Sequence, residues 1–324
     1  MTDTTPAVSP PSLDISVVIP VYGYKEKLCE LIERVRHALD NCVSEEAAQT
    51  YEIILIDDCG PGSAWDELCR LHQQFPEVAI VRLTRNFGQH NALMCGLSLA
   101  QGNRIVTLDD DLQNPPEEIP RLLRALEQNE ADVVYGVARS PEASPFRKFG
   151  SRIMQAAYSS SFGSRTRISS FRAMRRDLAK RITSYNKSFT FIDGLITWHT
   201  QSVATLEVEH HARQEGRSGY STRRLIVHAL DVLTNFSVFP LRLTSLVGVT
   251  MAAFAMFVGF YYLLRYMIIG IPVPGYTSIV VSVTLLAGVQ LLSLGIIGEY
   301  LGRLHLNVSG RPQFEIREAK QRRL

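Results

Sequence analysis

The stretch that decides the fold reads LDDDLQNPP and runs from Leu108 to Pro116. It follows directly on a short apolar run that starts at Arg104, so three consecutive aspartates stand where a buried strand stops. A strand that ends in acidic residues presents them at the carboxyl edge of a sheet, which is the usual ligand-binding edge of α/β folds. The stretch therefore predicts an α/β fold with a polar site at this strand end.

Oxygen-bearing side chains recur at every second position of the same stretch, as expected of a loop that binds a hard cation. Asp109, Asp111 and Gln113 alternate along the chain, so in an extended loop their oxygens converge on one ion. Such oxygen donors suit Mg²⁺ or Mn²⁺, and Mg²⁺ is usually held by one or two carboxylates together with substrate phosphates. The pattern thus indicates a phosphate-bearing substrate such as a nucleotide. The alternative is a solvated acidic turn ahead of a helix that opens at Pro115 and Pro116.

Strands and helices alternate along the first part of the chain. Strands are expected at 15–20, 51–56, 78–83, 104–108 and 132–136, and helices at 25–41, 63–75, 89–100 and 117–129. Such alternation implies a doubly wound, mostly parallel sheet. The strand ends then meet at one edge, where the ring of Tyr22 is suited to stack on a base and Asp57 or Asp58 to accept a hydrogen bond from a base or a ribose.

The length, charge and cysteine content of the chain limit the classes of function that it can have. The chain has 324 residues, and a formal net charge of +2 argues against nucleic-acid binding as its main activity. Basic residues nevertheless dominate 139–176 and 311–323, and such patches suit lipid headgroups or phosphates. The five cysteines show no CxxC spacing, which indicates free thiols in a reducing cytosol. Residues 1–13 lack the apolar core of a signal peptide and are expected to form a disordered tail.

Two long apolar segments predict a membrane hairpin. Residues 243–264 and 278–298 contain no charged side chain, and each has about the 20 residues needed to cross a bilayer. Arginines flank the outer ends of the pair, so the positive-inside rule puts both termini in the cytoplasm and the short loop outside. A pair of buried core helices is the alternative.

Two amphipathic stretches, about 146–162 and 223–242, precede the hairpin and have apolar faces edged with arginine. Helices lying in the membrane interface have this pattern, although core-facing helices look similar. The expected organisation is a tail at 1–13, a catalytic domain at 14–222, an interface helix at 223–242, the hairpin at 243–298 and a cytoplasmic tail at 299–324.

Several motifs resemble the inverting glycosyltransferases of family 2, which have a GT-A fold. In order, they are SVVIPVYGYKEKL, EIILIDDCGPGS, RLTRNFGQHNAL, VTLDDDLQNPPEEIP and VVYGVARS. Three later segments, RQEGRSGYS, FSVFPLRLTSLVG and LGIIGEYLGRLHLNVSGRPQF, are similar to the polyprenyl-phosphate members of that family. These members include dolichyl-phosphate mannose synthase and the GtrB and ArnC transferases. The resemblance covers essentially everything after Asp14, and the hairpin is of the GtrB and ArnC type.

The resemblance implies roles for the residues at the strand ends. It implies that the nucleotide is bound by Pro20, Tyr22, Asp57, Asp58 and Asp109, and the metal by Asp109, Asp111 and Gln113. Asp110 stands where the family often has alanine, so we expect it to be a spectator.

The resemblance also implies roles for basic residues later in the chain. Arg139 and Arg147 match family arginines and join Asp109 and Asp111 in the expected catalytic set. The acceptor phosphate is expected at Arg139, Arg147 and Ser151, and the loop over the diphosphates is expected to contain Arg213 and Arg217.

The sequence departs from the family pattern at three places. The motif IPxYNE reads IPVYGYKE, with Gly23 after the tyrosine. The motif GxSKY reads GRSGY, with Gly219 at the lysine position. The acid usual just upstream of the Phe-Arg pair is absent, and the segment offers Thr166, Ser169 and Ser170 instead. These departures bear on the donor sugar and the activity rather than on the fold.

The function implied by the resemblance is inverting, metal-dependent transfer of a sugar from a nucleotide sugar to polyprenyl (undecaprenyl) phosphate. The resemblance to bacterial members implies that the nucleotide is UDP rather than GDP. It also implies that the protein forms a homo-oligomer, namely a tetramer. The expected location is the cytoplasmic face of the bacterial inner membrane, where the lipid-linked product serves cell-envelope glycan modification. A lipid phosphate is already an anion and does not have to lose a proton before it reacts. It therefore depends more on arginines that position it than on a general base.

Two other functions compete with this interpretation. A polysaccharide synthase of the same family is disfavoured because the QxxRW pattern is missing and two spans are few for a translocation channel. A non-catalytic scaffold that binds a nucleotide sugar is favoured by the missing acid near Phe171. The intact Asp109, Asp111 and Gln113 argue against the scaffold.

Overall fold

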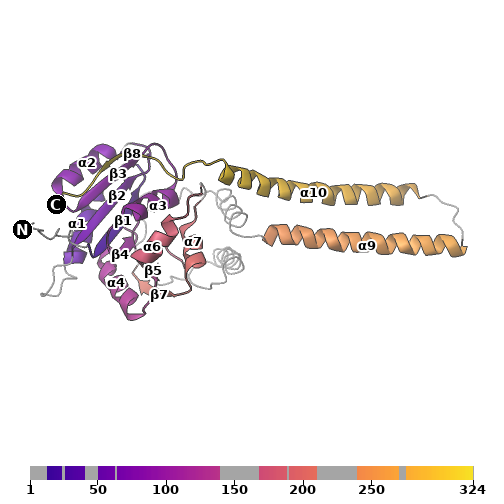
Figure 1. Cartoon of the computed structure of the whole chain (residues 1–324), viewed down its shortest axis with the longest axis horizontal. Helices are drawn as coiled ribbons and strands as arrows, with labels where there is room; N and C mark the ends of the chain where they lie inside the picture. The colour runs from indigo at the N-terminus through magenta and orange to yellow at the C-terminus, as the bar shows by residue number, and fades with distance from the viewer. Residues whose placement is uncertain are drawn as a thin grey trace, which may run out of the picture. The chain divides into compact units, whose positions relative to one another are not determined.

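The computed structural model describes residues 13–23, 26–40, 50–62, 64–138, 168–187, 190–209, 239–269 and 275–323. The chain divides into two compact units, one of Met1–Gly219 with Arg311–Leu324 and the other of Tyr220–Gly310. The first unit holds the sheet and its helices, and the second holds two long helices (Figure 1).

An eight-stranded sheet forms the centre of the first unit, in the order β7-β5-β6-β4-β1-β2-β3-β8. The strands are β1 (Ile15–Val21), β2 (Tyr51–Asp57), β3 (Val78–Leu83), β4 (Arg104–Thr107), β5 (Val133–Ala138), β6 (Arg172–Arg175), β7 (Val203–Val208) and β8 (Ile316–Lys320). Strands β1 to β4 pair in parallel, as do β5 and β7. Strand β6 is antiparallel to β4 and β5, and β8 is antiparallel to β3. The predicted α/β fold with a mostly parallel sheet is confirmed.

Helices cover both faces of the sheet (Figure 1). They are α1 (Leu28–Asp40), α2 (Trp65–Gln74), α3 (Gln89–Leu99), the short 3-10 helix η1 (Pro116–Glu118), α4 (Ile119–Gln128), α6 (Arg176–Thr183) and α7 (Ile192–His199). Successive residues of a strand point to opposite faces. In β1, Val17 and Ile19 join the core that includes α1, α2 and α4, whereas Val18 lies under α3. Both faces of β1 are therefore buried, which is why its sequence is a continuous apolar run.

The last residues of the chain return to the sheet as β8. The strand pairs with β3, and Thr84 donates its backbone N–H to the carbonyl oxygen of Glu315 at 2.9 Å. Arg323 donates from Nη2 to the carbonyl oxygen of His72 at 2.6 Å, near the end of α2. Strand β8 within 299–324, β6 and β7 were not predicted from the sequence.

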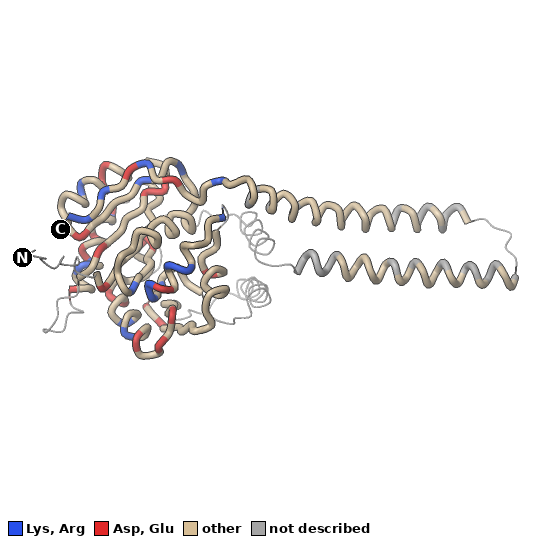
Figure 2. The backbone as a smooth tube through the Cα atoms, viewed as in Figure 1, with Lys and Arg blue, Asp and Glu red and all other residues tan. Residues whose placement is uncertain are grey.

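The second unit contains α9 (Phe239–Ile269) and α10 (Tyr276–Val308), which pack against one another. They contain the two segments predicted to span a membrane. Within the described residues, no helix satisfies both the length and the apolarity that a membrane crossing requires. The structure therefore does not confirm the hairpin as a membrane anchor, and the two spans stay a prediction. Figure 2 shows charged residues over the first unit and few along the described parts of α9 and α10.

Most of the two predicted interface helices falls outside the described residues. Nothing is described between 139 and 167 or between 210 and 238, and α9 begins at Phe239. The expected tail at 1–13 is likewise described only at Leu13, which is buried.

Candidate active site

The carboxyl ends of β1, β2 and β4 meet at one edge of the sheet. Asp58 donates its backbone N–H to the carbonyl oxygen of Val21 at 3.0 Å, and Leu108 donates to that of Val18 at 3.1 Å. Tyr22, which is 53% exposed, donates its backbone N–H to Oδ2 of Asp110 at 3.2 Å. The structure thus brings together the three strand ends that the sequence marked as polar.

Asp58 holds the loop between β3 and α3. Its Oδ1 accepts the backbone N–H of Phe87 at 2.7 Å, and its Oδ2 accepts that of Gly88 at 2.9 Å. Burial raises the pKa of Asp58 above its usual value, although the two N–H donors oppose this rise. A carboxylate oxygen has two lone pairs, so each oxygen can still accept a further hydrogen bond from a ligand. Asp58 therefore organises the site loop as well as offering a polar group at the predicted base pocket.

Asp57 is buried beside a cation at the end of β2. Its Oδ1 accepts the backbone N–H of Cys59 at 3.0 Å, and Nε of Arg82 lies 3.5 Å from its Oδ2. Burial raises the pKa of Asp57, and the Cys59 N–H and the charge of Arg82 lower it in part. Its Oδ1 thus accepts a hydrogen bond within the protein, whereas among the described residues its Oδ2 has the charge of Arg82 nearby but no hydrogen-bond donor.

The departure at Gly23 has a local cause in the backbone. Gly23 has a φ of +79°, and a Cβ atom there would lie 2.6 Å from the carbonyl oxygen of Pro61. A Cβ atom on Gly60 would in turn lie 2.1 Å from the backbone nitrogen of Gly23. The turns after β1 and β2 approach so closely that both positions require glycine.

Asp109 is held by side chains from two other segments. Gln89 donates from Nε2 to Oδ1 of Asp109 at 2.6 Å, and Ser170 donates from Oγ to Oδ2 at 2.5 Å. Burial, and then the charge of Asp111, raise the pKa of Asp109, whereas the hydroxyl of Ser170 and the charge of Arg172 lower it. The two predicted metal-binding carboxylates therefore lie close enough to repel each other.

The donor set suits a divalent cation. In the described part of the chain, no group of three or more His, Cys, Asp or Glu side chains is placed to hold a metal ion. Two carboxylates are nevertheless the usual protein contribution to a Mg²⁺ site that substrate phosphates complete. A cation between Asp109 and Asp111 would also relieve their repulsion. Gln113 donates its backbone N–H to Oδ1 of Asp111 at 3.2 Å, so its established contact is through the backbone rather than the amide side chain.

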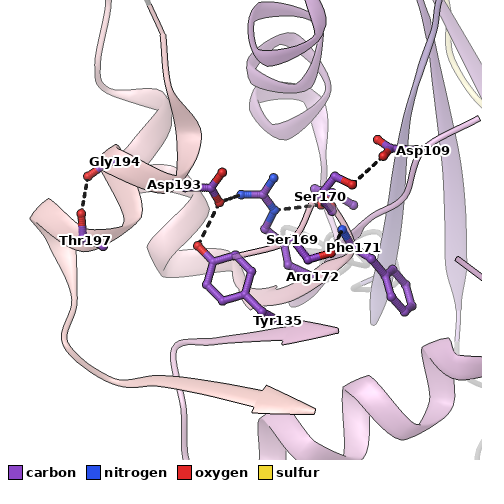
Figure 3. A network of polar contacts seen from close by, with 10 residues as sticks. Asp109, Tyr135, Ser169, Ser170, Phe171, Arg172, Asp193, Gly194 and Thr197 are labelled. Carbon is purple, nitrogen blue, oxygen red and sulfur yellow. Dashed lines mark hydrogen bonds and ion pairs between the residues drawn. The ribbon is translucent and has the colours of Figure 1, made fainter. Parts of the chain in front are cut away.

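A buried polar network that was not predicted from the sequence lies next to Asp109 (Figure 3). Arg172 is 1% exposed, forms an ion pair with Asp193, and donates from Nε to Oγ1 of Thr107 at 3.2 Å. Tyr135 donates its hydroxyl to Oδ1 of Asp193 at 3.0 Å. The signal available in the sequence was an arginine and an aspartate within apolar segments, because charges are rarely fully buried unless they are paired.

Five of the predicted site residues lie outside the described residues. They are Arg139, Arg147, Ser151, Arg213 and Arg217. The structure does not test the positions expected to meet the acceptor phosphate or to close over the diphosphates.

Comparison with known proteins identifies the family. Residues 16–189, more than half of the chain, match the sequence profile of glycosyl transferase family 2. An undecaprenyl-phosphate 4-deoxy-4-formamido-L-arabinose transferase from Serratia proteamaculans (strain 568) is 36% identical over 95% of this chain and 94% of its own. The protein of the same name from Pseudomonas aeruginosa (strain LESB58) is 36% identical over 93% of this chain and 89% of its own.

The similarity to solved structures is weaker. A glucosyl-3-phosphoglycerate synthase from Mycobacterium tuberculosis, in complex with Mn²⁺, UDP and phosphoglyceric acid, has a TM-score of 0.49. It is 17% identical and covers 68% of this chain and 76% of its own, which is too distant to carry an argument. The family profile and the full-length relatives are sufficient: the chain belongs to glycosyl transferase family 2, it is a glycosyltransferase, and its resemblance to the polyprenyl-phosphate members is confirmed.

Proposed function

We propose that the protein transfers a sugar from a nucleotide sugar, with UDP as the favoured nucleotide, to undecaprenyl phosphate. One observation carries the proposal, namely that the chain matches relatives named as undecaprenyl-phosphate transferases over almost its whole length. The position of Asp109 and Asp111 at the carboxyl edge of the sheet supports it, because a donor diphosphate needs a cation there.

The donor binds, in this proposal, across the ends of β1, β2 and β4. Tyr22 has an exposed ring for the base, and the buried Asp58 holds the loop at 87–88 in place beside it. A Mg²⁺ or Mn²⁺ ion bound at Asp109 and Asp111 would neutralise the charge that develops on the leaving nucleoside diphosphate. The protein fixes Asp109 for this task through Gln89 and Ser170.

The acceptor is a lipid phosphate that attacks the anomeric carbon in line with the leaving diphosphate, so one displacement inverts that centre. The phosphate is already ionised, and arginines that hold it near the sugar supply proximity and charge-assisted hydrogen bonds. Arg139, Arg147 and Ser151 are the residues we assign to it, with Arg213 and Arg217 in a loop over the diphosphates. These assignments rest on the resemblance stated above.

A lipid acceptor requires that the protein work at a membrane. We assign α9 and α10 to a hairpin anchor, with the catalytic unit and both termini on the cytoplasmic side of the bacterial inner membrane. Large apolar side chains on these helices support this, since Phe257 is 71% exposed and Leu291 is 70% exposed. Exposed apolar surface of this extent is typical of lipid or protein contacts. The product would be a lipid-linked sugar for cell-envelope glycans, made by a homo-oligomer that the resemblance suggests is a tetramer.

The experiment is a transfer assay with purified full-length protein in detergent. Radiolabelled UDP-sugars and GDP-sugars, among them UDP-4-deoxy-4-formamido-L-arabinose, are incubated with undecaprenyl phosphate and with Mg²⁺, Mn²⁺ or EDTA. We expect label to enter the organic phase only when both the lipid and a divalent cation are present. A lipid-independent polymer would instead indicate a polysaccharide synthase. Binding of nucleotide sugars without transfer of any would indicate a scaffold.

A further inference from the structure

Ser170 joins two parts of the molecule that are far apart in the sequence. Its hydroxyl donates to Oδ2 of Asp109 at 2.5 Å, while its own carbonyl oxygen accepts the hydroxyl of Thr107 at 2.6 Å. The neighbouring Ser169 does something different, because its hydroxyl oxygen accepts the backbone N–H of Phe171 at 3.2 Å. Of the two adjacent serines, Ser170 is thus the one whose contact lies at the site.

The backbone that carries Ser170 is fixed on both sides of β6. Phe171 is fully buried, its carbonyl oxygen accepts the N–H of Gly136 at 2.9 Å, and a Cβ atom on Gly136 would lie 2.6 Å from the Phe171 ring. Arg172 is anchored by its ion pair with Asp193 (Figure 3) and by its hydrogen bond to Thr107. The backbone is therefore fixed at a place from which the Ser170 hydroxyl reaches Asp109.

The carboxylate of Asp109 receives a neutral donor on each oxygen, Gln89 on Oδ1 and Ser170 on Oδ2. Two donors from separate segments fix the plane of the carboxylate, and each oxygen keeps a second lone pair. Groups that orient a metal ligand in this way typically matter nearly as much as the ligand itself. A carboxylate at position 170 would repel Asp109, whereas the serine hydroxyl donates a hydrogen bond to it. The absence of the family's usual acid from this segment therefore goes with a donor for Asp109.

We propose that Ser170 is a positioning residue, whose hydroxyl orients the Asp109 carboxylate for the cation and the donor diphosphate. The effect of Ser170 on sugar transfer rests on the proposed function. Ser170 is one of the residues found where the family usually has an acid. Removing the hydroxyl should weaken cation binding about 10-fold to 100-fold, as is usual when a partner that orients a metal ligand is lost.

The test compares three variants of the full-length protein. Ser170→Ala removes the donor, Ser170→Thr restores a hydroxyl, and Ser169→Ala is the matched control one residue away. Mn²⁺ binding is measured by electron paramagnetic resonance in the presence of UDP, so that no turnover is needed. The Mn²⁺ dependence of transfer is measured in parallel, and thermal unfolding confirms that each variant is folded.

We expect Ser170→Ala to bind Mn²⁺ about 10-fold to 100-fold more weakly and to recover most of its transfer rate at high Mn²⁺. Ser170→Thr should stay within about threefold of wild type, and Ser169→Ala should match wild type. Wild-type Mn²⁺ affinity in Ser170→Ala would overturn the inference. So would a loss of rate that saturating Mn²⁺ does not restore. Absence of lipid-dependent transfer in wild type would overturn the proposed function alone, because the Mn²⁺ comparison would still decide the role of Ser170.

Discussion

The three consecutive aspartates after β4 have three different environments. Asp109 is held by Gln89 and Ser170, Asp110 accepts the backbone N–H of Tyr22, and Asp111 accepts the backbone N–H of Gln113. The turn that follows them includes Leu112, whose φ is +57° although it is not glycine. Strained backbone of this kind persists where the surroundings fix it, and it is common at functional sites.

These contacts refine the role of Asp110. The sequence analysis expected a spectator, since the family often has alanine at this position. The carboxylate of Asp110 instead joins the acidic loop to the turn after β1, through Oδ2 and the N–H of Tyr22 at 3.2 Å. We therefore regard Asp110 as a contact that shapes the loop rather than as a ligand.

Asp111→Asn should abolish transfer with little loss of folding. The change removes one negative charge from a site for a hard cation, so the charge on the leaving diphosphate is no longer compensated. We expect at least a hundredfold loss of rate, which is about 2.7 kcal/mol of transition-state stabilisation. The measurement is the initial rate of transfer at saturating Mg²⁺ and Mn²⁺.

Asp110→Asn is the matched control for that experiment. It makes the same chemical change one residue away and leaves a side-chain oxygen to accept the Tyr22 N–H. We expect a rate within about tenfold of wild type, because the cation keeps both of its proposed carboxylates. If Asp111→Asn fell no further than Asp110→Asn, Asp111 would not belong to the metal site.

At the scale of elements, α3 connects the core to the site. Its residues Ala92 to Leu97 are buried, and its first residue is Gln89, which contacts Asp109. A Cβ atom on Gly96 would lie 2.3 Å from Cγ1 of Val18 and 2.7 Å from Cδ1 of Ile56. The helix therefore approaches β1 and β2 at a distance that only glycine allows.

Gly96→Ala should destabilise the protein even though alanine is the better helix former. The added methyl group has no space, and overpacking of a core typically costs about 1–3 kcal/mol. We expect a lower thermal unfolding temperature of the full-length protein, measured by circular dichroism. Gly248→Ala in α9 is the matched control, because among the described residues no atom beyond its chain neighbours and the nearby backbone of its own helix lies within 4 Å of the position that its Cβ would take. An unchanged unfolding temperature in Gly96→Ala would mean that α3 can shift away from the sheet.

The strands that the sequence predicted and those it missed differ in their physical basis. Strands β1 to β5 are buried apolar runs, and their predicted bounds are within two residues of those observed. Strand β8 and all of β7 except the buried Val208 have partly or fully exposed side chains, and β6 has four residues with an arginine at each end. Such strands are specified by pairing with a distant partner rather than by their own pattern.

The candidate site could be predicted only where it follows buried apolar strands. Asp57, Asp58, Asp109 and Asp111 follow directly on apolar strands, so parallel pairing alone brings them to one edge. The partners of these carboxylates come from elsewhere: Gln89 lies on α3, and Ser170 lies before β6. Hydrogen bonds between segments this far apart depend on the packing of the whole sheet, which no local pattern records.

At the scale of the molecule, the end of the chain is part of the catalytic unit. After α10, the side chain of Gln313 donates to the hydroxyl of Thr190, and β8 then pairs with β3. The loop that follows β3 supplies the two N–H groups that Asp58 accepts. The segment at 311–323 thus connects the long helices to an element that shapes the proposed donor site.

This connectivity makes the membrane topology testable. Ser309 directly follows α10, and only a short segment separates it from β8. If α10 crosses a bilayer, Ser309 and the sheet therefore lie on the same side of that bilayer. The proposed hairpin puts residues 266–277 on the other side. In intact spheroplasts, Thr277→Cys should therefore label with a membrane-impermeant thiol reagent, whereas Ser309→Cys should not.

Wild-type protein provides the control for this labelling. Its native cysteines all lie between Cys29 and Cys95, in the catalytic unit, and should be shielded in intact spheroplasts if that unit is cytoplasmic. Cys95 should stay unreactive even after lysis while the protein is folded, because burial raises the pKa of its thiol to about 12 and leaves almost no thiolate. Labelling of Ser309→Cys but not of Thr277→Cys would reverse the topology and move the catalytic unit to the outer face. Labelling of neither variant before lysis, and of both after it, would show that the helices do not cross the membrane.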